Sequence, residues 1–408
     1  MQEHPLVSIV IPVYNGATYM REAIDSALAQ TYPNIEILVV NDGSTDDTRE
    51  IALSYGDRIR YFEKENGGVS TALNLGIREM EGAYFSWLSH DDVYYPDKIQ
   101  AEIEALHVCG DVNMAVYCDW DLWYMPSGTI QHTSFGYSNR YMEIGIFPVL
   151  HGMLYGCTLL IPKNYFLQYG LFDETLKAAQ DNMKWYEMFH DKRIVYIPRS
   201  LLKERRHDKQ VTKTYGGFLK ENAECFRKMI DSMDSKCIEN MGLNIYTFYS
   251  AMSVWMLAME HRSIRDYLHV KIKEMEEPID ADIRCSEFSS WLNSFGGKRI
   301  SLYGAGKYGL AFAEALDLRG IGFHHIVDSD PKKWGMQIGS HKCMSPSELD
   351  FDDLIIVAMR QTDDIVHWLR SKGYTHILTY KLLEERLLSI PIKKKLLYKS
   401  GEYDALYA

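Results

Sequence analysis

The sequence has no C-x-x-C pair, no excess of positive charge and almost no long uncharged run. Its seven cysteines are odd in number, which is typical of reduced thiols and argues against a disulfide framework. The formal net charge of −12 argues against nucleic acid as a partner. The first residues lead directly into an apolar run without the features of a signal peptide, so we expect a cytoplasmic protein.

Residues 240–259 carry no charge and approach the length of a bilayer span. Polar side chains such as Asn240, Asn244 and Ser250 lower its hydropathy, which favours a buried helix between two domains over a transmembrane segment. Near the C-terminus, Lys393, Lys394 and Lys395 form a basic group. It predicts either a solvated tail or peripheral association with the inner face of a membrane.

Short apolar runs alternate with helical patterns in the first part of the chain. The runs are residues 7–11, 35–40, 59–62 and 85–88, and each ends in a loop rich in Gly, Asn, Asp or Ser. This alternation predicts an α/β fold with a parallel sheet and right-handed crossovers. The four loops should line the carboxyl edge of the sheet, where such folds bind their ligands.

The fourth run ends in two adjacent carboxylates, Asp91 and Asp92. Two like charges at a strand end repel each other unless a cation shares them or solvent screens them. The pair therefore indicates either a metal site at the sheet edge or two solvated turn residues.

Four motifs occur in a fixed order along this region: residues 12–15 (PVYN), 41–46 (NDGSTD), 66–76 (NGG…NLG) and 89–92 (SHDD). In order and spacing they resemble those of family 2 glycosyltransferases, over about the first 210 residues. The resemblance implies a GT-A fold, a nucleotide-diphosphate sugar donor (a UDP-sugar above all), Mn²⁺ or Mg²⁺, and inversion at the anomeric carbon. It also implies that Asp91 and Asp92 hold the metal. The implied donor-binding residues are Pro12, Val13, Tyr14, Asn15, Asp42 (which would contact the base), Asn66, Gly67 and Asp91.

Two positions depart from the family pattern. Ser89 stands where the motif usually has its first acidic residue, and Leu73 stands where many relatives have an arginine near the phosphates. Losing a guanidinium removes a bidentate phosphate contact. His90 is a candidate to compensate, as a phosphate donor or a metal ligand, against the alternative of a packed or solvated histidine.

The catalytic base implied by the resemblance is Asp181, which follows a G-x-F-D-E segment at residues 170–174. Gln180 replaces the usual glutamate before it. An inverting transfer needs one carboxylate near the acceptor hydroxyl. The alternative for Asp181 is a purely structural role at a helix N-terminus, with Asp173 and Glu174 as the next candidates for the base. Further on, His207 belongs to an R-x-H element that would approach the diphosphate or the metal, or else is a solvated turn residue.

Near residue 298 a second pattern begins. A predicted strand leads into Gly304, Gly306 and Gly309, and Asp328 follows after about 20 residues, as in dinucleotide-binding fingerprints. It resembles small Rossmann-like modules of bacterial sugar-modifying enzymes, which need not bind NAD. No Tyr-x-x-x-Lys follows the fingerprint.

We therefore predict a GT-A domain at residues 1–212, a helical connector at 213–297, a Rossmann-like nucleotide-binding-type domain at 298–380 and a tail at 381–408. The predicted reaction moves a sugar to the hydroxyl of a saccharide or lipid-linked saccharide, in bacterial cell-surface polysaccharide synthesis. The alternatives are an NAD-dependent sugar-modifying oxidoreductase that uses the C-terminal module, and a non-catalytic nucleotide-sugar-binding protein. The motifs specify neither the sugar, the acceptor nor an oligomeric state.

Overall fold

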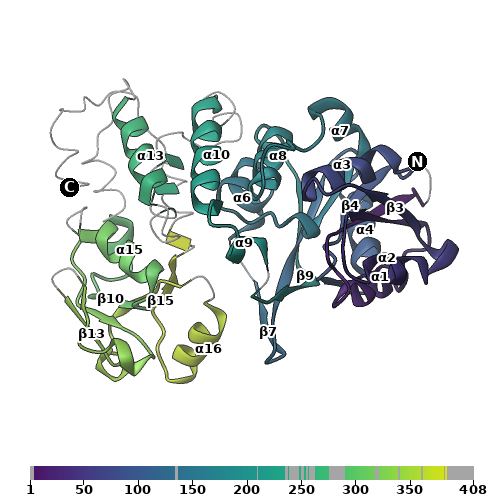
Figure 1. Ribbon diagram of the computed structural model, residues 1–408. Coiled ribbons are helices and arrows are strands. Elements are labelled where there is room, and N and C mark those ends of the chain that lie inside the picture. The colour runs from purple at the N-terminus through teal and green to yellow at the C-terminus, as the bar shows by residue number, and fades with distance from the viewer. Residues whose placement is uncertain are drawn as a thin grey trace. The chain divides into compact units, whose positions relative to one another are not determined.

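The structure is a computed structural model that describes residues 4–133, 137–208, 210–234, 262–274, 290–317, 321–338, 341–359 and 362–380, with residues 238, 248, 249, 252, 253, 256, 382 and 383. The chain divides into two compact units (Figure 1). The first comprises Met1–Ser134 and Ser138–Met229, and the second comprises Phe135–Tyr137 and Ile230–Ala408. The first unit thus extends beyond the boundary at residue 212 that the motifs suggest.

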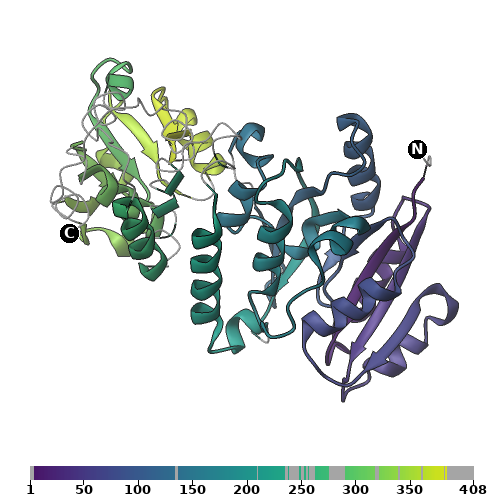
Figure 2. The same ribbon diagram turned by 90° about the horizontal axis from the view of Figure 1, so that it is seen from above.

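Four parallel strands form one half of the sheet in the first unit. They are β1 (Val7–Val13), β2 (Ile35–Asp42), β3 (Arg60–Lys64) and β4 (Tyr84–Trp87), paired in the order β3-β2-β1-β4. Figure 2 shows the first of these strands side by side in purple. All residues of β1 are buried, as is typical of a parallel strand covered on both faces. The parallel strands and the α/β fold class predicted from the sequence are therefore present.

The other half of this sheet mixes strand directions. β8 (Leu159–Pro162) runs antiparallel to β4, and β6 (Val116–Tyr124) runs antiparallel to β8. β9 (Val195–Arg206) then pairs parallel to β6, and it also pairs with the short β5 (Val93–Tyr94). A hairpin adds β7 (Thr129–His132) to β6. This arrangement brings the end of β9 next to the turn that follows β4.

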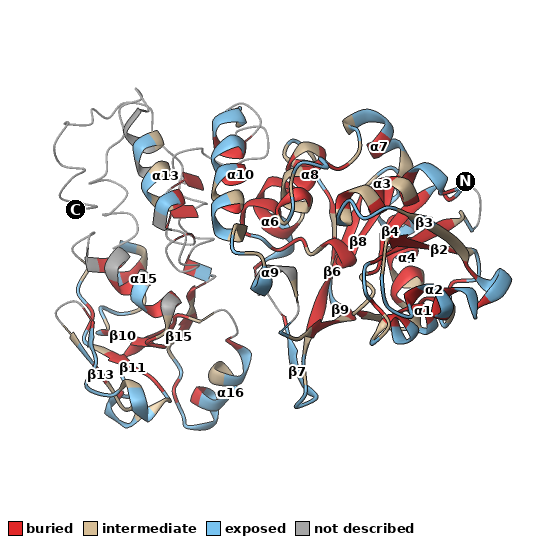
Figure 3. Ribbon diagram, viewed as in Figure 1, coloured by how far each residue is buried: buried red, intermediate tan, exposed pale blue. Residues whose placement is uncertain are grey.

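Helices cover the sheet of the first unit. Each long helix buries one stripe, and the outer faces are exposed (Figure 3). In α1, for example, the buried residues are Met20, Ala23, Ile24 and Ala27. The helices of this unit are α1 (Met20–Leu28), α2 (Thr48–Leu53), α3 (Val69–Glu79), α4 (Lys98–Cys109), α5 (Asn139–Met142), α6 (Ile146–Leu150), α7 (Lys163–Tyr169), α8 (Gln180–Phe189) and α9 (Val211–Thr214). The last helix, α10 (Phe218–Ser232), begins in this unit and runs past its end at Met229.

The second unit has its own six-stranded sheet, in the order β12-β13-β11-β10-β14-β15. Its strands are β10 (Ile300–Tyr303), β11 (His325–Val327), β12 (Gln337–Ile338), β13 (His341–Met344), β14 (Leu354–Val357) and β15 (Ile377–Thr379). All pairs are parallel except β12–β13, and the central position of the first strand, β10, matches doubly wound sheets. The helices α13 (Arg262–Glu274), α15 (Lys307–Asp317) and α16 (Asp363–Ser371) belong to this unit.

No helix in the described part of the chain is long and apolar enough to cross a membrane. In the uncharged segment at residues 240–259, the structure describes only Phe248, Tyr249, Met252, Ser253 and Met256, which are helical and buried. The rest of that segment and the basic group at residues 393–395 lie outside the described residues.

Gly145 provides a test of the packing between α6 and α8. A Cβ atom at this position would lie 2.2 Å from the carbonyl oxygen of Phe189, so the backbone itself must shift to admit a methyl group. We expect Gly145→Ala to lower the free energy of unfolding by about 1–3 kcal/mol, the usual cost of overpacking. Gly216→Ala, where a Cβ would meet nothing within 4 Å, is the matched control. Urea unfolding measures both, and equal stabilities would contradict the packing.

Candidate active site

The loops after β1 and β2 are joined through Asn15. Its backbone N–H donates to Ser44 Oγ over 2.9 Å, and its Oδ1 accepts from the N–H of Thr45 over 2.8 Å. Asn15 has a φ of 49°, in the left-handed region that asparagine tolerates better than most residues. Pro12 and Val13 are buried in or at the end of β1, whereas Tyr14 is 49% exposed. Of the predicted residues in this loop, Tyr14 and Asn15 are therefore the exposed ones, and their contact with a nucleotide remains a prediction.

Asp42 closes the end of β2 and is only 2% exposed. Its carboxylate accepts hydrogen bonds from Lys64 Nζ (2.6 Å) and from the N–H groups of Gly67 (3.0 Å) and Gly68 (2.7 Å). Its backbone oxygen accepts from Asn66 Nδ2 over 3.0 Å. Asp42 thus fastens the Asn66–Gly67 loop at the start of α3. The contact between Asp42 and a base remains a prediction.

Asp91 and Asp92 face different partners. Asp91 Oδ2 lies 2.9 Å from His207 Nε2. Burial raises the pKa of the Asp91 carboxyl, but the hydrogen bond with His207 and the nearby His90 outweigh burial and leave that pKa below its ordinary value. Asp91 is therefore an ionised carboxylate, next to the predicted His207.

Asp92 is 1% exposed, and both of its oxygens are used inside the protein. Oδ1 accepts from the N–H of Arg205 over 2.9 Å, and Oδ2 accepts from the hydroxyl of Tyr155. Burial, followed by the charges of Asp91 and Glu204, raises the pKa of Asp92 well above its ordinary value. Asp92 therefore fixes the turn, while Asp91 is the carboxylate better placed to reach a ligand.

The residues present fit a divalent metal ion whose remaining ligands are water and phosphate oxygens and not protein side chains. The described part of the chain contains no group of three or more His, Cys, Asp or Glu side chains arranged to hold a metal. Mg²⁺ is commonly bound by one or two carboxylates, with water and phosphate oxygens completing the shell. Asp91, whose other oxygen contacts no other described residue, with His207 beside it, is a donor set of that kind.

Arg205 holds this part of the site together, and the sequence analysis did not single it out. Its Nε donates to the backbone oxygen of Asp91 over 2.8 Å, and its Nη2 lies 3.0 Å from Glu22 Oε2. The guanidinium lies 4.3 Å from the ring centre of Tyr19 and 4.1 Å from that of Trp123. Its place in the R-x-H element is the one sequence signal that pointed to it.

Asp181 lies in the first turn of α8. Its Oδ1 accepts from the N–H of Asn182 over 2.8 Å, and no lysine, arginine or histidine of the described chain pairs with it. Burial raises the pKa of its carboxyl to about 6. A half-buried carboxylate without a cation and with a raised pKa has the properties of a general base.

The two runner-up carboxylates have structural partners. Asp173 is exposed and accepts from both the N–H and the hydroxyl of Thr175, and these bonds lower its pKa. Glu174 accepts from Asn74 Nδ2 over 2.8 Å. Asn74 also exchanges two hydrogen bonds of 2.9 Å with the backbone of Phe172. These contacts fasten the segment to α3 and engage both carboxylates, so Asp181 remains the predicted base.

In the second unit, Gly304, Gly309 and Asp328 lie close together. Gly304 has a φ of 113°, and a Cβ on Gly309 would lie 1.6 Å from the Gly304 oxygen, so α15 packs tightly on the loop. At Gly306 the nearest atom to a Cβ would be Lys333 Nζ, at 4.0 Å. Asp328 accepts from the N–H of Ala305 (2.7 Å) and from Lys333 Nζ (2.8 Å). Asp328, the acidic residue of the predicted nucleotide-binding fingerprint, is thus hydrogen-bonded within this part of the fold.

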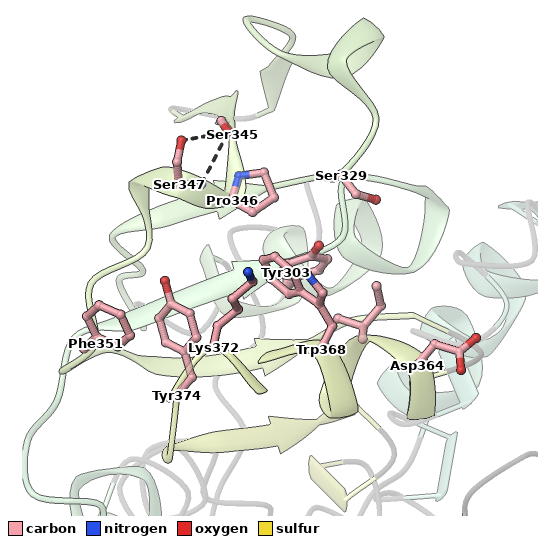
Figure 4. Close-up of a pocket in the computed structure, with 11 residues that line it drawn as sticks. Tyr303, Ser329, Ser345, Pro346, Ser347, Phe351, Asp364, Trp368, Lys372 and Tyr374 are labelled. Carbon is pink, nitrogen blue, oxygen red and sulfur yellow. Dashed lines mark hydrogen bonds between the residues drawn. The ribbon is translucent and has the colours of Figure 1, made fainter. Parts of the chain in front are cut away.

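A separate pocket of about 740 Å³ lies in the second unit (Figure 4). Tyr303 and Trp368 form an aromatic corner, with ring centres 6.1 Å apart, and Lys372 lies beside them. None of the residues predicted from the glycine fingerprint lines this pocket.

The mixed sheet, with its loops and carboxylates gathered at the ends of its strands, is that of a glycosyltransferase of the GT-A type. The family model "Glycosyl transferase family 2" matches residues 8–160. An uncharacterized glycosyltransferase of Rickettsia typhi is 51% identical over 53% of this chain and 72% of its own length. Another from Rickettsia prowazekii is 47% identical over 62% of this chain and 80% of its own length. The chain belongs to glycosyltransferase family 2.

A solved structure supports the fold. S. aureus TarS 1–349, in complex with UDP-GlcNAc, is similar to this chain with a TM-score of 0.50 at 13% identity. The match covers 82% of this chain and 97% of that one. Some family relatives are longer: the chain spans 32% of an uncharacterized glycosyltransferase of Rickettsia bellii, to which it is 49% identical over 54% of its own length.

The role of Arg205 can be tested by Arg205→Lys. A lysine retains the charge but cannot keep the planar contacts with both rings together with the bonds to Asp91 and Glu22. We expect a loss of about 1–3 kcal/mol in the free energy of unfolding, as for a buried network that loses a partner. Arg199→Lys is the control, since Arg199 makes an exposed ion pair with Asp97. Equal thermal denaturation of the two variants would show that Arg205 does not hold the turn.

Proposed function

We propose that this glycosyltransferase moves a sugar from a UDP-sugar to an acceptor hydroxyl with inversion, assisted by Mn²⁺ or Mg²⁺. The observation that carries the proposal is the half-buried carboxyl of Asp181, which has no cationic partner among the described residues and whose raised pKa of about 6 suits a base. It lies in the same compact unit as the Asp91–His207 pair. The UDP-GlcNAc named with TarS supports a UDP-sugar as the donor class.

The donor would be held by the loops at the ends of the parallel strands. Tyr14 and Asn15 would contact the nucleotide, and the Asp42 carboxylate keeps the Asn66–Gly67 loop in place beside it. Asp91 and His207 would hold the metal, which when bound neutralises charge on the diphosphate leaving group. Arg205 keeps Asp91 in position, because its N–H donates to the Asp92 carboxyl and its Nε donates to the backbone oxygen of Asp91.

Asp181 would accept the proton of the acceptor hydroxyl. As the acceptor oxygen forms its bond to the anomeric carbon, the bond from that carbon to the diphosphate oxygen breaks, and the diphosphate leaves with the electron pair. With Asp181 as the single base, the transfer would be one displacement with inversion, as the family resemblance implies. A saccharide or lipid-linked saccharide of cell-surface polysaccharide synthesis is the acceptor we propose, on the family resemblance.

The two alternative functions have less support. An oxidoreductase would need the glycine loop of the second unit to bind NAD, yet Asp328, the acid of that fingerprint, is paired with Lys333. A non-catalytic binding protein would not account for the carboxyl of Asp181, whose pKa is raised by burial.

Asp181→Asn tests the base. The amide keeps the size of the side chain but cannot accept a proton, so kcat should fall by about 10²–10⁴ while UDP binding changes little. In the native chain, kcat/KM should rise with pH through about 6, because only the ionised carboxylate is the base. Asp173→Asn is the control. Normal turnover by a folded Asp181→Asn would place the base elsewhere.

The metal site is tested by calorimetry of UDP with and without Mn²⁺. Mn²⁺ should raise the affinity for UDP, and Asp91→Asn should remove most of that gain because it removes a charged ligand. Asp97→Asn, at an exposed ion pair with Arg199, should keep the gain. UDP binding that is independent of Mn²⁺ in all three proteins would contradict a metal at Asp91.

A further inference from the structure

A carboxylate of α10 accepts hydrogen bonds from the backbone N–H groups that precede the proposed base in the sequence. Glu221 Oε1 accepts hydrogen bonds from the N–H groups of Lys177 (3.1 Å), Ala178 (2.7 Å) and Ala179 (2.8 Å). Oε2 lies 3.1 Å from the same N–H of Lys177. Ala179 immediately precedes α8, and Asp181 follows two residues later. One side chain thus holds three consecutive amides at the entrance to the helix.

These amides need an acceptor from outside the segment. Of the three, only the N–H of Ala179 belongs to the helix terminus, where the first N–H groups have no partner within the helix and carry the positive end of its dipole. Lys177 and Ala178 lie before α8. Ala179, at the cap position, has no side-chain acceptor, and no side-chain cap hydrogen bond forms there. Hydrogen bonds from amides to an ionised carboxylate are stronger than neutral ones, so Glu221 supplies what the local sequence lacks.

Glu221 is ionised in this position. Burial raises the pKa of its carboxyl, but the three backbone hydrogen bonds and the hydroxyl of Tyr215 outweigh burial, and the net shift is downward. The Tyr215 hydroxyl lies 3.5 Å from Oε2. Because Glu221 satisfies these amides, the carboxyl of Asp181 is not their partner, and its Oδ1 accepts from the adjacent N–H of Asn182.

The next residue of α10 extends the contact to the other side of the base. Asn222 Oδ1 accepts from Asn182 Nδ2 over 3.4 Å, and Asn222 is buried. Two consecutive residues of α10 therefore hold the chain before and after Asp181. The family model ends at residue 160, well before α10.

We propose that Glu221 is a positioning residue for transfer: it fixes the turn at residues 177–179 and thereby aims the Asp181 carboxylate at the acceptor hydroxyl. This inference rests on the proposed role of Asp181 as the base. Glu221 acts through Asp181 and not on the substrate itself. A displacement of about 1 Å at a reacting group can cost about 10²-fold in rate, so the first turn of α8 is a sensitive place.

The test compares Glu221→Ala and Glu221→Gln in the full chain. The alanine variant should lose about 10–100-fold in kcat, with KM for the UDP-sugar and affinity for UDP unchanged within about twofold. The glutamine variant keeps a neutral oxygen acceptor for the amides, so its kcat should lie between those of the alanine variant and the native protein. Glu224→Ala, at an exposed position of the same helix, should retain native kcat.

The double variant Asp181→Asn with Glu221→Ala separates positioning from general destabilisation. If Glu221 acts only through the base, adding Glu221→Ala to Asp181→Asn should lower kcat no further, since effects of residues that act as a unit are not additive. Losses that multiply, or a native kcat in folded Glu221→Ala, would overturn the proposal. If Glu221→Ala does not fold, the glutamine variant decides in the same way. Native kcat in Asp181→Asn alone would instead reject the proposed base, and the inference with it.

Discussion

The first unit is organised by the cost of burying carboxylates. A buried carboxylate is tolerated only where N–H or cationic groups replace the water that it has lost. Asp42 is satisfied by the loop at Gly67 and Gly68, and Asp92 by the N–H of Arg205. In each case the donor groups are distant in the sequence from the carboxylate. The hydrogen bonds that satisfy a buried carboxylate therefore connect separate segments of the chain. The loops of the site are held in place largely by these contacts.

The same constraint divides the acidic residues by role. Where backbone amides or hydroxyl groups saturate both oxygens, as at Asp92, the carboxylate fixes a turn. Asp91 and Asp181 each have an oxygen without a partner in another residue of the described chain. Their pKa values are shifted in opposite directions, downward at Asp91 and upward at Asp181, which suits an anion that binds a cation and a base that accepts a proton. Carboxylates that have an oxygen without such a partner are therefore the candidates for metal binding or proton transfer.

Local patterns predicted the parallel half of the sheet because alternation of apolar runs and loops is a short-range signal. The resemblance to the family added the identities of the site residues. The tight contacts of Arg205 were not predicted, since they join α1, the turn after β4 and β9 across nearly the whole unit. Glu221 was missed for the same reason: nothing in its neighbourhood indicates that it meets amides more than forty residues earlier. The sequence also could not show that Asp91 and Asp92 have different partners. Asp92 binds Tyr155 and Arg205, which are distant from it in the sequence and reach it only in the folded chain.

The two departures from the family pattern are consistent with this electrostatic constraint. Leu73 is fully buried in α3, where it packs in the core, so an arginine there would bury a charge. The hydroxyl of Ser89 lies 3.2 Å from Cys157 Sγ and 3.5 Å from the hydroxyl of Tyr155, the group that donates to Asp92. A carboxylate in place of Ser89 would add another negative charge close to Asp92 and would raise further a pKa that burial and Asp91 already raise. The neutral serine adds no charge to the turn, which suits the proposed division of roles, with Asp92 saturated inside the protein and Asp91 facing the proposed metal ion.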